Sequence, residues 1–136
     1  MNTATIRFRK VLLVDDNPID LFINSLVLEN EQLAAHIDSA ADGQEALEYI
    51  EHTGQASQCP DLILLDINMP RMNGFEFLDH YANTACHAAS ATLIVVLTTS
   101  SHTQDKQRAG TYGQVKAYLD KPLTAEKLLK VIGPIS

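Results

Sequence analysis

Short aliphatic runs alternate with amphipathic segments along the whole chain. Three runs, Val11–Val14, Leu62–Leu65 and Leu93–Leu97, have no polar alternation, which is typical of parallel strands that are covered on both faces. Weaker candidates for strands lie at His36–Ala40 and Val115–Leu119. The pattern therefore predicts five strands, separated by segments of another kind.

Those segments have helical spacing. Pro18 suits a first helical position, and the residues Ile19, Phe22, Ile23 and Leu26 then follow at a spacing that forms one apolar face. We expect this face to meet the core, with Leu21 and Leu28 on the opposite side. Further helices are expected after Asp42, from near Gly74, over about 102–109 and after Thr124, with polar loops at 53–60 and 83–92.

A strand followed by a helix, repeated five times, predicts an α/β fold with right-handed crossovers. We expect a doubly wound, five-stranded parallel sheet in the order 2-1-3-4-5 with five helices, as in flavodoxin-like folds. Strands 1 and 3 are then neighbours at the centre. Such folds bind ligands in the crevice at that switch point, outside the carboxyl ends of the strands.

Carboxylates stand where these two central strands end. The stretch "VLLVDD" ends in Asp15 and Asp16, and "LILLD" ends in Asp66. One such residue could simply cap the next helix, but three of them at one crevice indicate a site. Because like charges at short distance repel, we expect a cation to hold the cluster, and oxygen ligands without nearby His or Cys favour Mg²⁺ over zinc.

Two more polar residues end neighbouring strands. Thr98 follows "LIVVL", and Lys121 follows "YLD". A carboxylate between a metal and an ammonium is arranged to attack phosphorus, because both cations offset the charge of an incoming phosphoryl group. The sequence therefore predicts that an aspartyl phosphate forms here, with the Thr98 hydroxyl placed to bind one of its oxygens.

Composition and charge narrow the class of protein. The chain has 136 residues, 46% of them hydrophobic, and a formal net charge of −7, so we expect one globular domain that does not bind nucleic acid. The N-terminus has no secretory signal and the run "LIVVL" is too short to span a membrane. We interpret Cys59 and Cys86 as reduced, structural cysteines of a cytoplasmic protein.

Taken together, the motifs resemble the receiver domains of two-component response regulators. The resemblance rests on "VLLVDDN", "DGQEAL", "PDLILLDINMPRMNGFEFL", "VVLTTSS" and "AYLDKPL", in this order, and covers about Lys10 to Ile132. We therefore assign residues 10–133 to a receiver domain and 1–9 to an N-terminal extension. Little sequence follows the last helix, so we expect no output domain and a stand-alone regulator.

The resemblance also implies roles for individual residues. Asp66 would accept the phosphoryl group; Asp16 would bind Mg²⁺ directly, Asp15 largely through water, and Asn68 through its main-chain carbonyl. Lys121 would contact the phosphoryl group, Thr98 would be the switch hydroxyl and Tyr118 the switch aromatic residue. The implied partners are a histidine kinase or histidine phosphotransfer protein and an unknown downstream protein. By the way the family docks its kinases, we expect Leu21 in the kinase interface.

Three alternatives remain at this point. A Mg²⁺-dependent phosphohydrolase also uses an Asp nucleophile, but its general acid would stand at position 68, where an asparagine cannot donate and recover a proton. A degenerate receiver could act as an unphosphorylated binding module, although every chemical position is filled. A fragment of a hybrid kinase is the third alternative, against which we set the Met1 start.

Overall fold

A computed structural model describes residues 7–53, 59–89, 92–99 and 103–133. Its centre is one sheet of parallel strands in the order β2-β1-β3-β4-β5, which confirms the predicted fold class. The strands are β1 (Phe8–Val14), β2 (Ala34–Ala40), β3 (Leu62–Asp66), β4 (Leu93–Thr98) and β5 (Val115–Asp120). β1 begins two residues before Lys10, so Phe8 and Arg9, which we had assigned to an extension, belong to the sheet.

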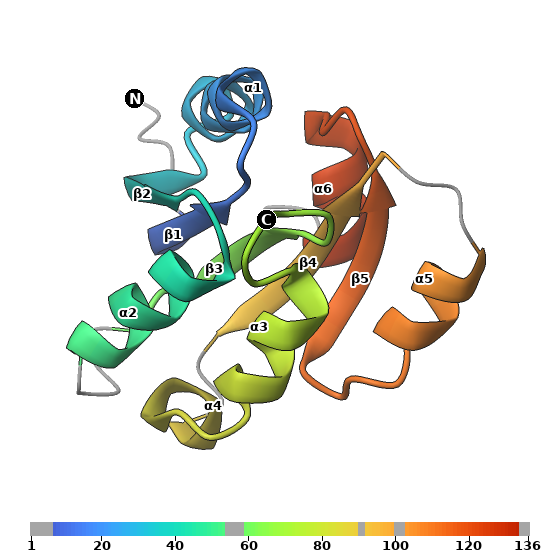
Figure 1. Cartoon of the computed structure of the whole chain (residues 1–136). Helices are drawn as coiled ribbons and strands as arrows, with labels where there is room; N and C mark the ends of the chain where they lie inside the picture. Colours follow the sequence, from blue (N-terminus) through green and yellow to red (C-terminus); the bar gives the residue numbers. More distant parts are fainter. Residues whose placement is uncertain (1–6, 54–58, 90–91, 100–102, 134–136) are drawn as a thin grey trace.

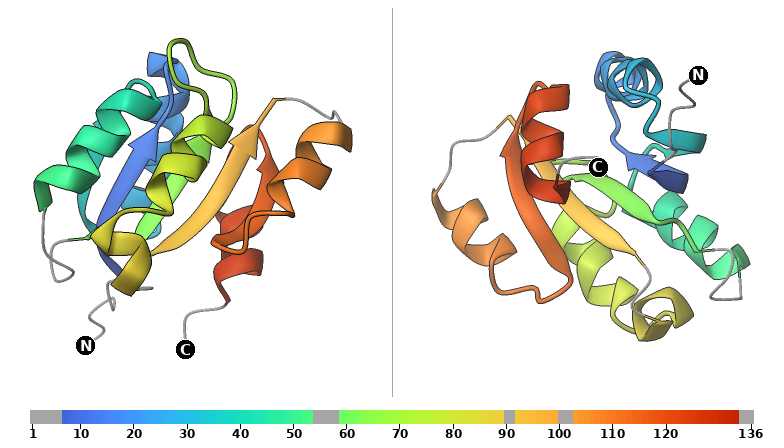
Figure 2. Two further views of the ribbon diagram at one scale, coloured as in Figure 1. Left: turned by 60° about the horizontal axis from the view of Figure 1, so that its bottom comes forward. Right: turned by 180° about the vertical axis from the view of Figure 1, so that it is seen from behind.

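Helices cover both faces of the sheet (Figure 1). They are α1 (Pro18–Asn30), α2 (Gly43–Thr53), α3 (Gly74–Tyr81), α4 (Ala85–Ala89), α5 (Thr103–Ala109) and α6 (Ala125–Ile132). α1 and α6 lie on one face and the other helices on the opposite side, as both views in Figure 2 show. Alternate residues of the central strands enter the two cores, for example Leu12 and Leu13 of β1.

Side-chain caps fix where several helices begin. The Asn17 side chain accepts hydrogen bonds from the N–H groups of Ile19 and Asp20, Asp42 accepts from Glu45, and Thr124 accepts from Lys127. Each cap satisfies an N–H group that has no partner within its helix. The helix starts expected at Pro18 and after Asp42 and Thr124 are therefore confirmed.

The 83–92 segment was predicted as a loop and is partly helical. It contains α4, so the described residues form six helices where we expected five. α4 also carries Cys86, which forms a disulfide bond with Cys59 ahead of β3, with 5.7 Å between the Cα atoms. The expectation of two reduced cysteines was wrong, and it no longer supports a cytoplasmic location. A sequence separation of 27 residues gave no local sign of the pairing.

The buried face of α1 also differs from the prediction. Ile19 and Phe22, expected in the core, are 68% and 64% exposed, and Leu26 is exposed as well. The buried residues are Asn24 and Leu28, and Leu21 packs against the same core. The apolar spacing predicted the wrong buried face, because α1 buries the polar residue Asn24 and exposes the face that carries Phe22.

The beginning and the end of the domain are in contact. The Arg7 guanidinium donates hydrogen bonds to the carbonyl oxygens of Ile132 and Gly133, so the start of β1 is tied to the end of α6. None of the helices in the described part of the chain has the length and apolar character needed to cross a bilayer.

Candidate functional site

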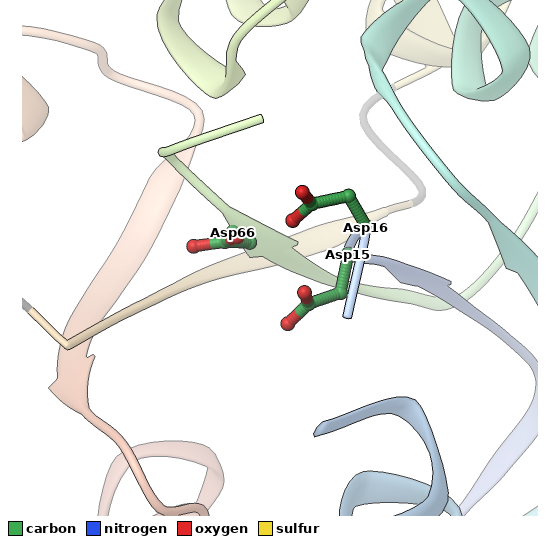
Figure 3. A group of neighbouring side chains, drawn as sticks. All are labelled: Asp15, Asp16 and Asp66. Atoms are coloured by element: carbon green, nitrogen blue, oxygen red, sulfur yellow. The ribbon is translucent and has the colours of Figure 1, made fainter. Parts of the chain in front are cut away.

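The three predicted carboxylates meet at one edge of the sheet. Asp15 and Asp16 follow the last residue of β1, and Asp66 is the last residue of β3, so the parallel pairing of β1 with β3 brings them together. One carboxylate oxygen from each lies within 4.8 Å of the other two. Figure 3 shows the side chains of Asp15 and Asp16 beside that of Asp66. Asp15 and Asp66 are buried, whereas Asp16 is exposed.

Lys121 reaches the same site from the end of β5. Its Nζ lies 2.7 Å from Asp15 Oδ2, 2.8 Å from Asp20 Oδ2 and 3.6 Å from Asp66 Oδ1. Burial disfavours the charged ammonium, but the hydrogen bonds to Asp15 and Asp20 and the charge of Asp66 outweigh this effect and raise the pKa of Lys121. The lysine therefore stays protonated among carboxylates.

Asp66 has an unusual environment for an aspartate. Its burial raises the pKa of its carboxyl group to about 6; the nearby Lys121 charge opposes this shift, and the charge of Asp15 adds to it. At neutral pH the carboxyl group is still mostly ionised.

Thr98 lies on β4, the strand beside β3, and Tyr118 lies on β5, the next strand of the sheet. Thr98 is fully buried as the last residue of β4, and its carbonyl oxygen accepts a 2.8 Å hydrogen bond from the Lys121 N–H. Burial raises the pKa of Tyr118, while a hydrogen bond with the Thr98 side chain opposes the shift. The two side chains that were predicted to act together are therefore in contact.

The loop that follows Asp66 is held to the start of α2. The Gly43 N–H donates to the Met72 carbonyl oxygen at 3.0 Å, and the Arg71 guanidinium pairs with the buried carboxylate of Asp42. Burial alone would raise the pKa of Asp42, but the hydrogen bond from Glu45 and the charge of Arg71 hold it below its usual value. This anchor fixes the loop that carries Asn68.

Two residues of the site, Asp20 and Arg71, were not predicted from the sequence. Asp20 is hydrogen-bonded to Lys121, although in the sequence it reads only as an acidic residue in a first helical turn, which the helix dipole favours anyway. Arg71 pairs with Asp42 across 29 positions, and Arg71 has a left-handed backbone with φ of 64°. Neither pairing leaves a local signal in the sequence.

The residues at this edge fit a Mg²⁺ ion. Opposite oxygens around Mg²⁺ lie about 4 Å apart, which is compatible with three carboxylate oxygens within 4.8 Å of one another. Within the described ranges no backbone N–H donates to the Asn68 carbonyl oxygen, whereas the neighbouring Ile67 carbonyl accepts from Gly74. The donor set consists only of oxygen atoms, as this ion prefers.

Residues 11–133 match the family model described as the response regulator receiver domain. The chain belongs to this family. Receiver domains act in two-component phosphorelay signalling, typically signal rather than catalyse, and generally bind Mg²⁺ at an acidic pocket. They interact with sensor histidine kinases and downstream effectors. The comparisons support this function and not the phosphohydrolase alternative.

Similar proteins include both longer and comparable chains. The nitrate/nitrite response regulator NarL of Escherichia coli is 34% identical over 123 residues, which span 90% of this chain and 52% of NarL. Protein PilH of Pseudomonas aeruginosa is 29% identical over 126 residues, 93% of this chain and 96% of PilH. The crystal structure of a two-component response regulator from Cytophaga hutchinsonii superposes with a TM-score of 0.84 at 28% identity, covering 93% and 95% of the two chains.

Proposed function

We propose that this receiver domain accepts a phosphoryl group on Asp66 from a histidine kinase or a histidine phosphotransfer protein. The observation that carries the proposal is the position of the Asp66 carboxylate, which lies at the crevice with Asp15, Asp16 and Lys121 around it. In the reaction an Asp66 oxygen attacks phosphorus while the bond from phosphorus to the donor nitrogen breaks. The products are an aspartyl phosphate and the free imidazole of the donor.

Each neighbouring residue would have a separate task. Lys121 would donate to a phosphoryl oxygen, and Asp16, Asp66 and the Asn68 carbonyl would hold Mg²⁺ directly. Both oxygens of Asp15 already accept hydrogen bonds, from Asn17 and Lys121, which supports a role for Asp15 through water. When bound, Mg²⁺ would neutralise charge on the phosphoryl oxygens during transfer.

The signal would leave the site through Thr98 and Tyr118. The phosphoryl group would attract the Thr98 hydroxyl, and the Tyr118 ring would occupy the space released. Their contact in the structure supports this coupling. Lys106 of α5 lies over the Tyr118 ring at 5.6 Å, so a ring movement would reach the α5 surface and change the affinity for a downstream protein.

The partner that donates phosphate would dock on α1. We place the contact on Ile19, Phe22 and Leu26, the exposed apolar residues of this helix, and not on Leu21, which packs against the core. Large apolar side chains grouped on one exposed helix face mark an interaction site. No attached output domain enters this proposal; binding or onward phosphate transfer is the output.

The test separates chemistry from docking. Incubation with Mg²⁺ and a small acyl-phosphate donor should add one acid-labile phosphoryl group to wild type and none to Asp66→Asn. Phe22→Glu should still react with the small donor but lose transfer from the kinase, whereas Glu29→Gln, an exposed change on the same helix, should behave as wild type. Equal labelling of wild type and Asp66→Asn would overturn the proposal.

A further inference from the structure

Lys121 makes its closest contacts with residues other than the proposed phosphoryl acceptor. Its ammonium group has three donors, and two of them are engaged, by Asp15 at 2.7 Å and Asp20 at 2.8 Å. Asp66 Oδ1 is 3.6 Å away, beyond an ordinary hydrogen bond. The lysine side chain is 9% exposed, so water competes little for it. Asp20 therefore holds Lys121 on the side of α1.

Asp20 is available for this contact because of the way α1 begins. An acidic residue at the third helical position usually reaches back to the N–H of the capping residue. Glu76 does so at the start of α3, where it accepts from Asn73 at 3.1 Å. At the start of α1 the N–H of the cap Asn17 instead donates to Asp15 Oδ1 at 2.9 Å. Asp20 is left to accept from Lys121.

We propose that Asp20 is a positioning residue that competes with the phosphoryl group on Asp66 for Lys121. This inference rests on the proposed function. Nζ of Lys121 lies 2.8 Å from Asp20 Oδ2 and 3.6 Å from Asp66 Oδ1, so a lysine that turns toward a phosphoryl oxygen on Asp66 moves away from Asp20 and loosens that bond. The Asp20 pair therefore stabilises the unphosphorylated state relative to the phosphorylated one, and it keeps the lysine ordered beside the site before phosphate arrives.

The sign of the effect follows from this competition. Asp20→Asn removes the charge and keeps a weaker hydrogen-bond acceptor, so Lys121 is released more easily. The phosphorylated form is then stabilised relative to the unphosphorylated form. Asp20 is 25% exposed, which weakens its pair with Lys121, so we expect a gain of about 3- to 10-fold in affinity for a phosphoryl analogue. Asp20→Glu retains the charge and should behave nearly as wild type.

The experiment is a titration with the beryllium trifluoride anion in the presence of Mg²⁺, followed by backbone amide NMR signals near the site. Asp20→Asn should bind it about 3- to 10-fold more tightly than wild type. Glu76→Gln removes a charge at the equivalent position of α3 and is the matched control, with unchanged affinity expected. In a Lys121→Met background the Asp20→Asn change should have no effect, since the lysine through which Asp20 acts is gone.

A second measurement needs no metal. Melting of wild type, Asp20→Asn, Lys121→Met and the double variant in chelator should show a favourable coupling between Asp20 and Lys121. Unchanged affinity in Asp20→Asn, or an equal gain in the Lys121→Met background, would overturn the inference and leave the proposed function intact. A wild-type protein that neither binds the beryllium trifluoride anion nor gains phosphate would overturn both the inference about Asp20 and the proposed function.

Discussion

Gly74 allows the closest backbone approach at the site, and its replacement is our most specific structural prediction. A Cβ atom on Gly74 would lie 2.7 Å from the carbonyl oxygen of Asp66 and 2.9 Å from Cα of Ile67, whereas ordinary contacts begin at 3.4 Å. Asp66 would have to move by about 0.7 Å to relieve the first contact. It is buried and paired with β4 opposite Leu97, so it cannot move without disturbing the sheet.

The magnitude follows from this overlap. Forcing an extra methyl group into a packed site costs about 1–3 kcal/mol. For a domain of 136 residues each kcal/mol lowers the melting temperature by roughly 3–4 °C. Gly74→Ala should therefore lower the melting temperature by about 3–12 °C and slow phosphate uptake, because the proposed acceptor, Asp66, is displaced.

The assay is thermal melting followed by circular dichroism, together with the rate of labelling by the small acyl-phosphate donor. Gly113→Ala is the matched control, since a Cβ there meets nothing within 4 Å and its backbone is not left-handed. This control should melt within about 2 °C of wild type. If Gly74→Ala melted and reacted like Gly113→Ala, the close approach of α3 to Asp66 would be refuted.

Three further predictions concern Asp66, the disulfide bond and Thr98. The folded state raises the pKa of Asp66 from 3.8 to about 6, so this group destabilises the fold as pH rises through that window. Asp66→Asn should therefore raise the metal-free melting temperature more near pH 8 than near pH 4. An equal effect at both pH values would refute the shift in pKa. Reduction of the disulfide, which closes a sequence separation of 27 residues, should cost about 3–4 kcal/mol in a melt with reductant, and an unchanged melt would show that the bond constrains little. Thr98→Ala should still accept phosphate but lose most of a phosphate-dependent gain in partner affinity of about 5- to 150-fold; an affinity ratio equal to that of wild type would assign the switch to other residues.

Much of the fold was predictable because its signals are local. The uninterrupted apolar runs of β1, β3 and β4 are buried on both faces, as their composition predicts. Thr124 and Asp42 cap helices where the sequence placed them. The carboxylate cluster was predictable for a related reason, since strand order alone brings the ends of β1 and β3 together.

The features that were predicted wrongly or not at all depend on tertiary contacts. The buried stripe of α1 includes Asn24, so apolar spacing favoured the side that carries Phe22 and faces solvent. The disulfide and the pairing of Asp20 with Lys121 join segments that are distant in the sequence, and tertiary geometry alone decides them. At the site, the grouping of Asp66 with the other strand-end carboxylates was therefore predictable from the sequence, whereas the contact of Asp20 with Lys121 was not.

We propose that phosphate enters this protein on Asp66. The most direct measurement treats the phosphorylated protein with borohydride, which reduces an aspartyl phosphate to homoserine, and locates the change by peptide mass spectrometry. We expect the change at position 66 alone, in wild type treated with Mg²⁺ and the acyl-phosphate donor, and no change without Mg²⁺. Reduction at position 15 or 16, or a phosphoryl group that resists borohydride, would contradict it.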